Sequence, residues 1–217
     1  MSVITIERKI LGKNDEVAEQ NRNQFLQHKI FVFNLVSSPG SGKTSILERT
    51  LEHLAGTINV AVIEGDVQTD FDAQRVAKYN IPVVQIVTRG GCHLDASLVR
   101  EALQKMTLTG FQLLIIENVG NLVCPANYDL GEALKVVVVS TTEGDDKPLK
   151  YPEMFRNASV LLINKIDLLP YVNCDLTVLK RNALQINSQL TVFETSCTTK
   201  SGIPEWCGWI IGKIPAK

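Results

Sequence analysis

The segment Ser37 to Thr44 restricts the fold of this 217-residue chain more than any other feature, because its sequence is typical of loops that bind phosphate. Its residues S-S-P-G-S-G-K-T follow the apolar run 30–36 and precede the helical pattern of 45–54. A phosphate-binding loop needs this strand, loop and helix setting, since backbone N–H groups and the helix N-terminus surround the phosphates. Ser37 stands where the usual pattern G-x-x-x-x-G-K-[ST] has its first glycine, so the match is one residue short. The segment therefore predicts a P-loop at the end of a buried strand.

The loop predicts a nucleotide ligand with a magnesium ion. Lys43 is placed to reach the β- and γ-phosphates, and the hydroxyl of Thr44 would ligate magnesium. The residues expected to contact the nucleotide here are Pro39, Gly40, Ser41, Gly42, Lys43, Thr44 and Ser45.

A second motif, N-K-I-D at Asn164 to Asp167, predicts that the base is guanine, and hence that the ligand is GTP or GDP. The carboxylate of Asp167 can accept hydrogen bonds from the ring N–H and the amino group of guanine, whereas adenine would leave it unpaired, at a cost of about 1–3 kcal/mol. Asn164 would orient the loop, and the alkyl stem of Lys165 could cover the base. Backbone groups of Ser196 and Cys197, after a later strand, are candidates for the guanine oxygen.

The run Phe111 to Gly120 ends in E-N-V-G and predicts the hydrolytic part of the site. Glu117 closes an apolar strand and can act on magnesium, while the Gly120 amide is placed to sense the γ-phosphate. Asp66 follows another strand and is a second carboxylate for the metal, although a turn or helix cap is an alternative role for it. GTPases often have D-x-x-G at this point, and no water-orienting glutamine follows Gly120, so we expect slow intrinsic hydrolysis.

Cys92, His93 and Cys124 form a second set of functional candidates, which ordinary nucleotide chemistry does not use. Two thiolates and one imidazole suit zinc or nickel, and three ligands leave a coordination position open. Both segments follow strands, which in a parallel sheet can place them at one edge. Structural thiols beside an incidental histidine are the alternative reading. Cys124 is four residues from Gly120, a span of at most about 14 Å, so a shift of Gly120 should also move Cys124.

Composition excludes several classes of function. The chain has 22 basic and 23 acidic residues, a net charge of -1, so no basic surface for nucleic acid is expected. No apolar stretch approaches the roughly 18 residues of a membrane span, and the charged start is unlike a signal peptide. We therefore expect a cytoplasmic protein without a membrane partner. The five cysteines favour free thiols or metal ligands over a disulfide framework.

The alternation of apolar and amphipathic segments predicts an α/β fold, a mainly parallel sheet with helices on both faces. Strands are expected near residues 30–36, 58–63, 82–87, 111–116, 134–140, 158–163 and 190–195. Helices are expected near 16–28, 43–55, 70–79, 94–106, 175–188 and 202–213. We divide the chain into an N-terminal helical extension, 1–29, and a P-loop GTPase domain, 30–217, that contains the metal site.

With these motifs in view, the chain from about Gln24 onward resembles the HypB family, the GTPases that incorporate nickel into hydrogenases. The resemblance rests on the P-loop and N-K-I-D-L-L, on Glu64 to Arg75, Gly90 to Asp95, Glu117 to Pro125, and Glu143 to Pro152. It implies a SIMIBI-class GTPase that dimerises when GTP is bound and works with HypA, a nickel metallochaperone, on [NiFe]-hydrogenase large-subunit precursors. It also implies that Cys92, His93 and Cys124 are the metal site. Residues 1–29 contain no cysteine and only His28, so we do not expect them to form the N-terminal nickel motif that many members have.

Several points stay open at this stage. Lys147 or Lys150 could reach a nucleotide, even that of a partner subunit, but solvated loop charges are the simpler interpretation. Alternative functions are a urease-type nickel GTPase, which has a different metal motif, a small-molecule kinase, and a non-enzymatic metal store. The donor set accepts both nickel and zinc.

Overall fold

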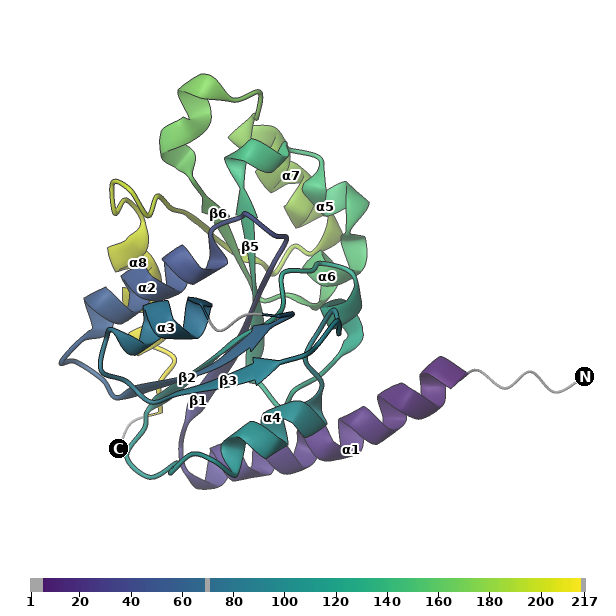
Figure 1. Ribbon diagram of the computed structural model, residues 1–217. Coiled ribbons are helices and arrows are strands. Elements are labelled where there is room, and N and C mark those ends of the chain that lie inside the picture. Colours follow the sequence, from purple (N-terminus) through teal and green to yellow (C-terminus); the bar gives the residue numbers. More distant parts are fainter. Residues whose placement is uncertain (1–5, 69–70, 216–217) are drawn as a thin grey trace, which may run out of the picture.

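The computed structural model describes residues 6–68 and 71–215, and a parallel β-sheet of seven strands lies at its centre (Figure 1). The strands are β1 (Phe31–Ser37), β2 (Val60–Asp66), β3 (Val83–Val87), β4 (Leu113–Glu117), β5 (Leu134–Ser140), β6 (Val160–Asn164) and β7 (Thr191–Glu194). Their order across the sheet is β3-β2-β4-β1-β5-β6-β7, and every neighbouring pair is parallel. The predicted strands and fold class are confirmed.

The helices alternate with these strands along most of the chain. They are α1 (Ile6–Gln27), α2 (Lys43–Leu54), α3 (Phe71–Ala77), α4 (Ala96–Leu103), α5 (Lys147–Lys150), α6 (Pro152–Asn157), α7 (Leu176–Ile186) and α8 (Ile203–Ile211). Short 3-10 helices are η1 (Cys124–Asn127), η2 (Thr141–Glu143) and η3 (Ile166–Tyr171). The six predicted helices are confirmed with shifted ends. Position 70 of the helix expected at 70–79 lies outside the described residues. The helices α5 and α6 and the three 3-10 helices were not predicted.

Both faces of the sheet are covered, which explains the continuous apolar strands. On one face Phe33 of β1 packs with Trp206 of α8, in the apolar cluster that also contains the buried apolar residues of α2. On the other face, residues such as Val32 belong to a cluster with α1 and α4, and Val137 belongs to one with α6 and α7. Because the five inner strands are buried on both sides, their apolar residues do not alternate with polar ones, whereas the edge strands β3 and β7 are only partly buried.

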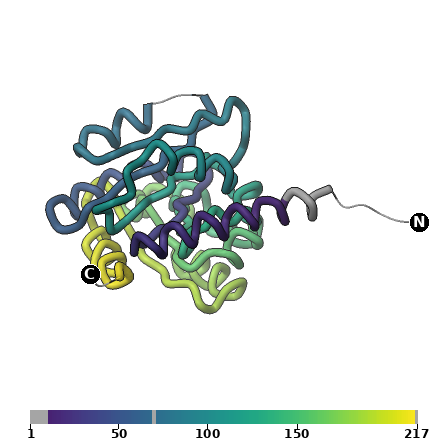
Figure 2. Tube along the Cα trace, turned by 90° about the horizontal axis from the view of Figure 1, so that it is seen from below, coloured from purple at the N-terminus to yellow at the C-terminus, as the bar shows by residue number. Residues whose placement is uncertain are grey.

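The N-terminal helix α1 runs beside α4 (Figure 2) and is fastened to the sheet domain by two buried asparagines. Asn14 accepts a hydrogen bond from the Ala96 amide (2.9 Å) and donates one to the Asp129 carbonyl (2.8 Å). Asn21 donates to the carbonyls of Ala96 (2.9 Å) and Leu130 (3.1 Å). Each asparagine thus bridges the start of α4 and the segment before β5. Residues 1–5 of the predicted extension lie outside the described residues.

Gly131 gives a test of how closely α1 packs. Its φ is +92°, and a Cβ there would lie 2.7 Å from the Ala18 carbonyl oxygen in α1. Gly110 is a matched control, because its φ is +95° and a Cβ would meet nothing within 4 Å. Both alanine variants carry the cost of a left-handed backbone, about 1–2 kcal/mol, and only Gly131→Ala adds an overpacking cost of about 1–3 kcal/mol.

We therefore expect Gly131→Ala to lower the free energy of unfolding by about 1–3 kcal/mol more than Gly110→Ala does, as measured by urea denaturation. Equal losses in the two variants would contradict the close contact between Gly131 and α1.

All five cysteines are free thiols. In the two described ranges, no helix combines the length and apolar character that crossing a bilayer requires.

Candidate nucleotide and metal site

A cavity of about 570 Å³ opens at the carboxyl ends of β1, β2 and β4, the edge at which open parallel sheets bind ligands. Four segments line it: the loop after β1, the end of β2 with the adjoining face of α3, the residues after β4, and Lys165 after β6. Its lining residues include Ser38, Pro39, Gly40, Gly42, Lys43, Thr44, Ser45, Asp66, Asp72, Arg75, Gly120 and Lys165. The structure thus brings most of the predicted phosphate contacts to one cavity.

The phosphate loop and the N-K-I-D segment are joined by direct hydrogen bonds. The amide of Asn164 donates to the Ser41 carbonyl (3.0 Å), and the ammonium of Lys165 donates to the Gly40 carbonyl (2.6 Å). Gly42 allows this close approach, because its φ is +91° and a Cβ would lie 2.5 Å from the Asn164 amide nitrogen. The two motifs, more than 120 residues apart, therefore form one structure.

The predicted guanine contacts lie beside one another after β6 and β7. The hydroxyl of Ser196 donates to Oδ1 of Asp167 (2.6 Å), and the thiol of Cys197 lies 3.6 Å from Oδ1 of Asn164. The guanidinium of Arg49 donates to the Cys197 carbonyl (3.0 Å) and so holds this loop to α2. Ser196 therefore orients the carboxylate that would select the base.

Glu117 is the centre of the predicted magnesium site and is fully buried. Its Oε1 pairs with the Lys43 ammonium and accepts a hydrogen bond from the Thr44 hydroxyl (2.7 Å). The three side chains with the strongest predicted roles in phosphate and magnesium binding are thus in mutual contact. The positive charge of Lys43 offsets the cost of burying this carboxylate.

Two further carboxylates, Glu64 and Asp72, lie with Glu117 in a group whose ligand oxygens are all within 4.8 Å of one another. Burial and the neighbouring charge of Glu117 raise the pKa of Glu64 to about 11. Among the described residues, no hydrogen-bond partner is found for Oε2 of Glu64 or for Oε2 of Glu117. Buried oxygens of this kind fit a divalent cation, which prefers oxygen ligands.

Sequence reasoning missed Glu64 and Asp72. It selected Asp66, which does line the cavity but is not a member of this carboxylate group. Side chains two residues apart on a strand share a face, so the choice of Asp66 could have indicated Glu64 as a second candidate on the same strand. Glu64 pairs in register with Glu117. Asp72 is brought in by α3, which no spacing rule could indicate.

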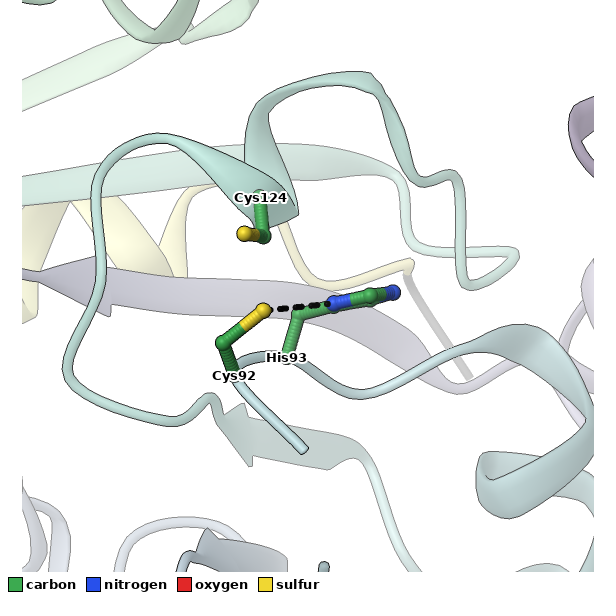
Figure 3. Close-up of side chains that lie close together, drawn as sticks. All are labelled: Cys92, His93 and Cys124. Atoms are coloured by element: carbon green, nitrogen blue, oxygen red, sulfur yellow. Dashed lines mark hydrogen bonds between the residues drawn. The ribbon is translucent and has the colours of Figure 1, made fainter. Parts of the chain in front are cut away.

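Cys92, His93 and Cys124 converge on one point, as Figure 3 shows. Their ligand atoms all lie within 4.8 Å of one another, and Sγ of Cys92 is 3.5 Å from Nδ1 of His93. Cys124 begins η1, and its hydrogen bond with Cys92, together with burial, raises the pKa of the Cys92 thiol. Burial lowers the pKa of His93, which favours the neutral ring, the form that binds a metal. A metal bound here would displace the thiol proton.

The triad is assembled across an intervening strand. The loop that carries Cys92 follows β3 and Cys124 follows β4, while β2 lies between those strands. The next residue of the loop, Leu94, is fully buried over Gly65 of β2, where a Cβ would come within 2.7 Å of it. The missing side chain at Gly65 lets the loop cross β2 and bring Cys92 and His93 to Cys124.

The lysines after β5 occupy different surroundings. Lys147 is largely buried and pairs with Glu143 (3.2 Å), whose other oxygen accepts from the Ser41 hydroxyl (2.9 Å) in the phosphate loop. Lys150 is exposed and pairs with Asp146 (2.6 Å). Lys147 is therefore linked to the phosphate loop through Glu143, and Lys150 has the solvated position expected of a loop charge.

Comparison with known proteins agrees with the motifs. Residues 31–194 match the family model described as CobW/HypB/UreG, nucleotide-binding domain. The hydrogenase maturation factor HypB of Azotobacter vinelandii is 52% identical over 208 residues, which cover 96% of this chain and 69% of that protein. The structure of HypB from Archaeoglobus fulgidus superimposes with a TM-score of 0.88 at 38% identity, covering 94% of this chain and 100% of the other. The structure of HypB from Helicobacter pylori in complex with nickel superimposes with a TM-score of 0.89 at 36% identity, covering 93% of this chain and 94% of the other.

Proposed function

Since the chain belongs to the HypB family of hydrogenase maturation factors, we propose that it is a slow GTPase that assists nickel insertion into [NiFe]-hydrogenase precursors. The observation that carries the proposal is the convergence of Cys92, His93 and Cys124, the last of which follows Gly120 of the nucleotide cavity by four residues. A metal site that shares the segment after Gly120 with a nucleotide site can hold or release its metal according to the nucleotide. Residues 30–217 would form the GTPase domain and residues 1–29 its extension, in a cytoplasmic protein.

The nucleotide half of the site would act through placement and charge. The loop from Pro39 to Ser45 would surround the phosphates, with Lys43 exchanging its contact with Glu117 for the β- and γ-phosphates. Asp167 would select guanine. Thr44, Glu117 and Asp66 would hold magnesium, with Glu64 and Asp72 nearby. Magnesium would neutralise the charge that develops on the phosphate oxygens. The Gly120 amide would sense the γ-phosphate.

The metal half would hold nickel, or zinc, as cargo. Three ligands leave a coordination position open, through which the metal could enter and leave. A two-fold homodimer formed with GTP would bring two triads together and could complete the coordination across the interface. The partners we propose are a HypA-type nickel metallochaperone, as the source of the metal, and the hydrogenase large-subunit precursor, as its destination.

The decisive test is hydrogenase maturation in cells that lack the native gene and carry wild type, Lys43→Ala or Cys92→Ala, each with and without added nickel. We expect both variants to mature about a tenth or less of the wild-type hydrogenase, because one loses the phosphate cation and the other a metal ligand. Lys43→Ala should also fail to dimerise with a non-hydrolysable GTP analogue, as measured by light scattering.

Cys174→Ala is a suitable control for the loss of a thiol, because Cys174 is a partly buried free thiol outside the metal triad. It should mature hydrogenase like wild type. Full maturation by both Lys43→Ala and Cys92→Ala would refute the proposed function. Nickel binding that is indifferent to the nucleotide would point instead to a metal store.

A further inference from the structure

The loop that carries Cys92 and His93 is hydrogen-bonded at two points to the segment around Gly120. Oδ1 of Asn118 accepts from the Leu94 amide (3.0 Å) and also from the Val119 amide (2.9 Å). Nδ2 of Asn121 donates to the Cys92 carbonyl (3.1 Å), and Oδ1 of Asn121 accepts from the Val123 amide (2.9 Å). We refer to Asn118 and Asn121 as the asparagine clasp. It holds the loop on both sides of His93.

Asn118 is placed to respond to the nucleotide rather than only to fill space. It lies between Glu117 of the magnesium site and Val119, which lines the nucleotide cavity together with Gly120. Its side chain is fully buried, and its Nδ2 donates to Oδ1 of Asn34 (3.2 Å) in β1. With its amide nitrogen held by β1, the side chain has little freedom to rotate independently.

One oxygen of Asn118 therefore serves two backbone amides, one beside the γ-phosphate sensor and one beside a metal ligand. If Gly120 moves toward a γ-phosphate and carries the adjacent Val119 amide with it, the hydrogen bond from that amide to Oδ1 of Asn118 changes direction. The Leu94 amide donates to the same oxygen and is affected with it. Leu94 is itself confined, because its side chain is buried against Gly65. A rearrangement at Leu94 is consequently transmitted along the chain to His93 and Cys92.

We propose that the asparagine clasp couples the nucleotide to Cys92 and His93, so that all three metal ligands, and not Cys124 alone, respond to the γ-phosphate. Asn118 and Asn121 are positioning residues, since neither belongs to the metal triad. The inference rests on the proposed function, because it needs both GTP and a metal at this site. It adds a second route to the covalent connection between Gly120 and Cys124.

The test compares wild type with Asn118→Ala and Asn121→Ala. The dissociation constant for Ni²⁺ is measured by competition with a chromophoric chelator, once with GDP and once with the β,γ-imido analogue of GTP, both with Mg²⁺. In wild type we expect the two constants to differ at least about five-fold, and in each variant to differ by no more than about two-fold. GDP affinity should stay within about three-fold of wild type in all proteins. By reciprocity, Ni²⁺ should change the affinity for the analogue by the same factor as the analogue changes that for Ni²⁺.

A second readout needs no metal and would not respond to a purely structural role. The rate at which iodoacetamide alkylates Cys92 in the metal-free protein should differ between GDP and the analogue in wild type but not in the variants. Asn121→Ala keeps the test available should Asn118→Ala fold poorly, because Asn121 is only partly buried. Asn182→Ala is the matched control: it removes a buried amide that donates to the Asp145 carbonyl (3.0 Å) and should retain the wild-type difference.

The outcomes separate the inference from the proposed function. Nucleotide-dependent Ni²⁺ affinity in wild type that persists in both clasp variants overturns the inference and leaves the proposed function standing. If Asn182→Ala also loses the nucleotide dependence of Ni²⁺ affinity, the inference is overturned too, since the loss of any buried side-chain amide would then have the same effect. Identical Ni²⁺ affinities with GDP and the analogue in wild type overturn both.

Discussion

Asp167→Asn should convert the nucleotide preference of this protein from guanine to xanthine. The carboxylate of Asp167 would accept hydrogen bonds from the N1–H and the 2-amino group of guanine, and an asparagine would present an N–H group to one of those donors. The affinity for GDP should therefore fall by about two orders of magnitude or more, because a site built around hydrogen bonds strongly rejects a base that leaves them unpaired. Xanthine carries a carbonyl at the 2-position, which the new amide can satisfy.

Ser196→Ala provides the matched control for this exchange. The Ser196 hydroxyl donates to Oδ1 of Asp167 (2.6 Å) and orients the carboxylate without changing its charge. Its loss should weaken GDP binding by about ten-fold, the effect of one hydrogen bond to a charged group, and give no gain for xanthine. Dissociation constants for GDP, xanthosine diphosphate and ADP, measured by calorimetry, distinguish the two variants. Unchanged GDP affinity in Asp167→Asn would mean that Asp167 does not contact the base.

The strands were predictable because burial on both faces leaves a continuous apolar signal. The run Val136 to Val139 has no polar interruption, and all four residues are fully buried in β5. The six-residue helix α6, Pro152–Asn157, was not predicted, because a helix of fewer than two turns contains too little periodicity to recognise. The predicted start of α1 was late, since residues 12–15 show no apolar periodicity and Asn14 contacts the rest of the molecule through hydrogen bonds.

The site was predictable where chemistry needs particular residues at particular spacings. The P-loop and N-K-I-D have such spacings, and Cys92, His93 and Cys124 have an uncommon donor set. Their convergence across β2 depends on the lack of a side chain at Gly65. The sequence shows this glycine but not that the loop with Cys92 and His93 crosses the sheet over it. Nor could it indicate the hydrogen bonds of Asn118, because a buried amide accepts partners from any direction and leaves no pattern along the chain.

Gly42→Ala should weaken GDP binding by about 100-fold, roughly 2.7 kcal/mol, because it separates the two nucleotide motifs. A Cβ at Gly42 would lie 2.5 Å from Nδ2 of Asn164, which is buried and donates to the Ser41 carbonyl (3.0 Å). Asn164 must then move, which breaks this hydrogen bond and displaces both the phosphate loop and the segment that carries Asp167. The change should also reduce the preference for GDP over ADP.

Gly40→Ala is the control that distinguishes the steric clash with Asn164 from the backbone strain of a left-handed residue in the same loop. Gly40 has a φ of +79°, against +91° for Gly42, yet a Cβ at Gly40 would meet nothing within 4 Å. Both variants should therefore lose about 1–2 kcal/mol of unfolding free energy without nucleotide through the left-handed backbone, and Gly42→Ala should lose more. Fluorescence titrations with GDP and ADP, beside urea denaturation of the nucleotide-free proteins, measure both effects. Equal loss of guanine preference in the two variants would show that the contact between Gly42 and Asn164 is not what holds the base and phosphate motifs together.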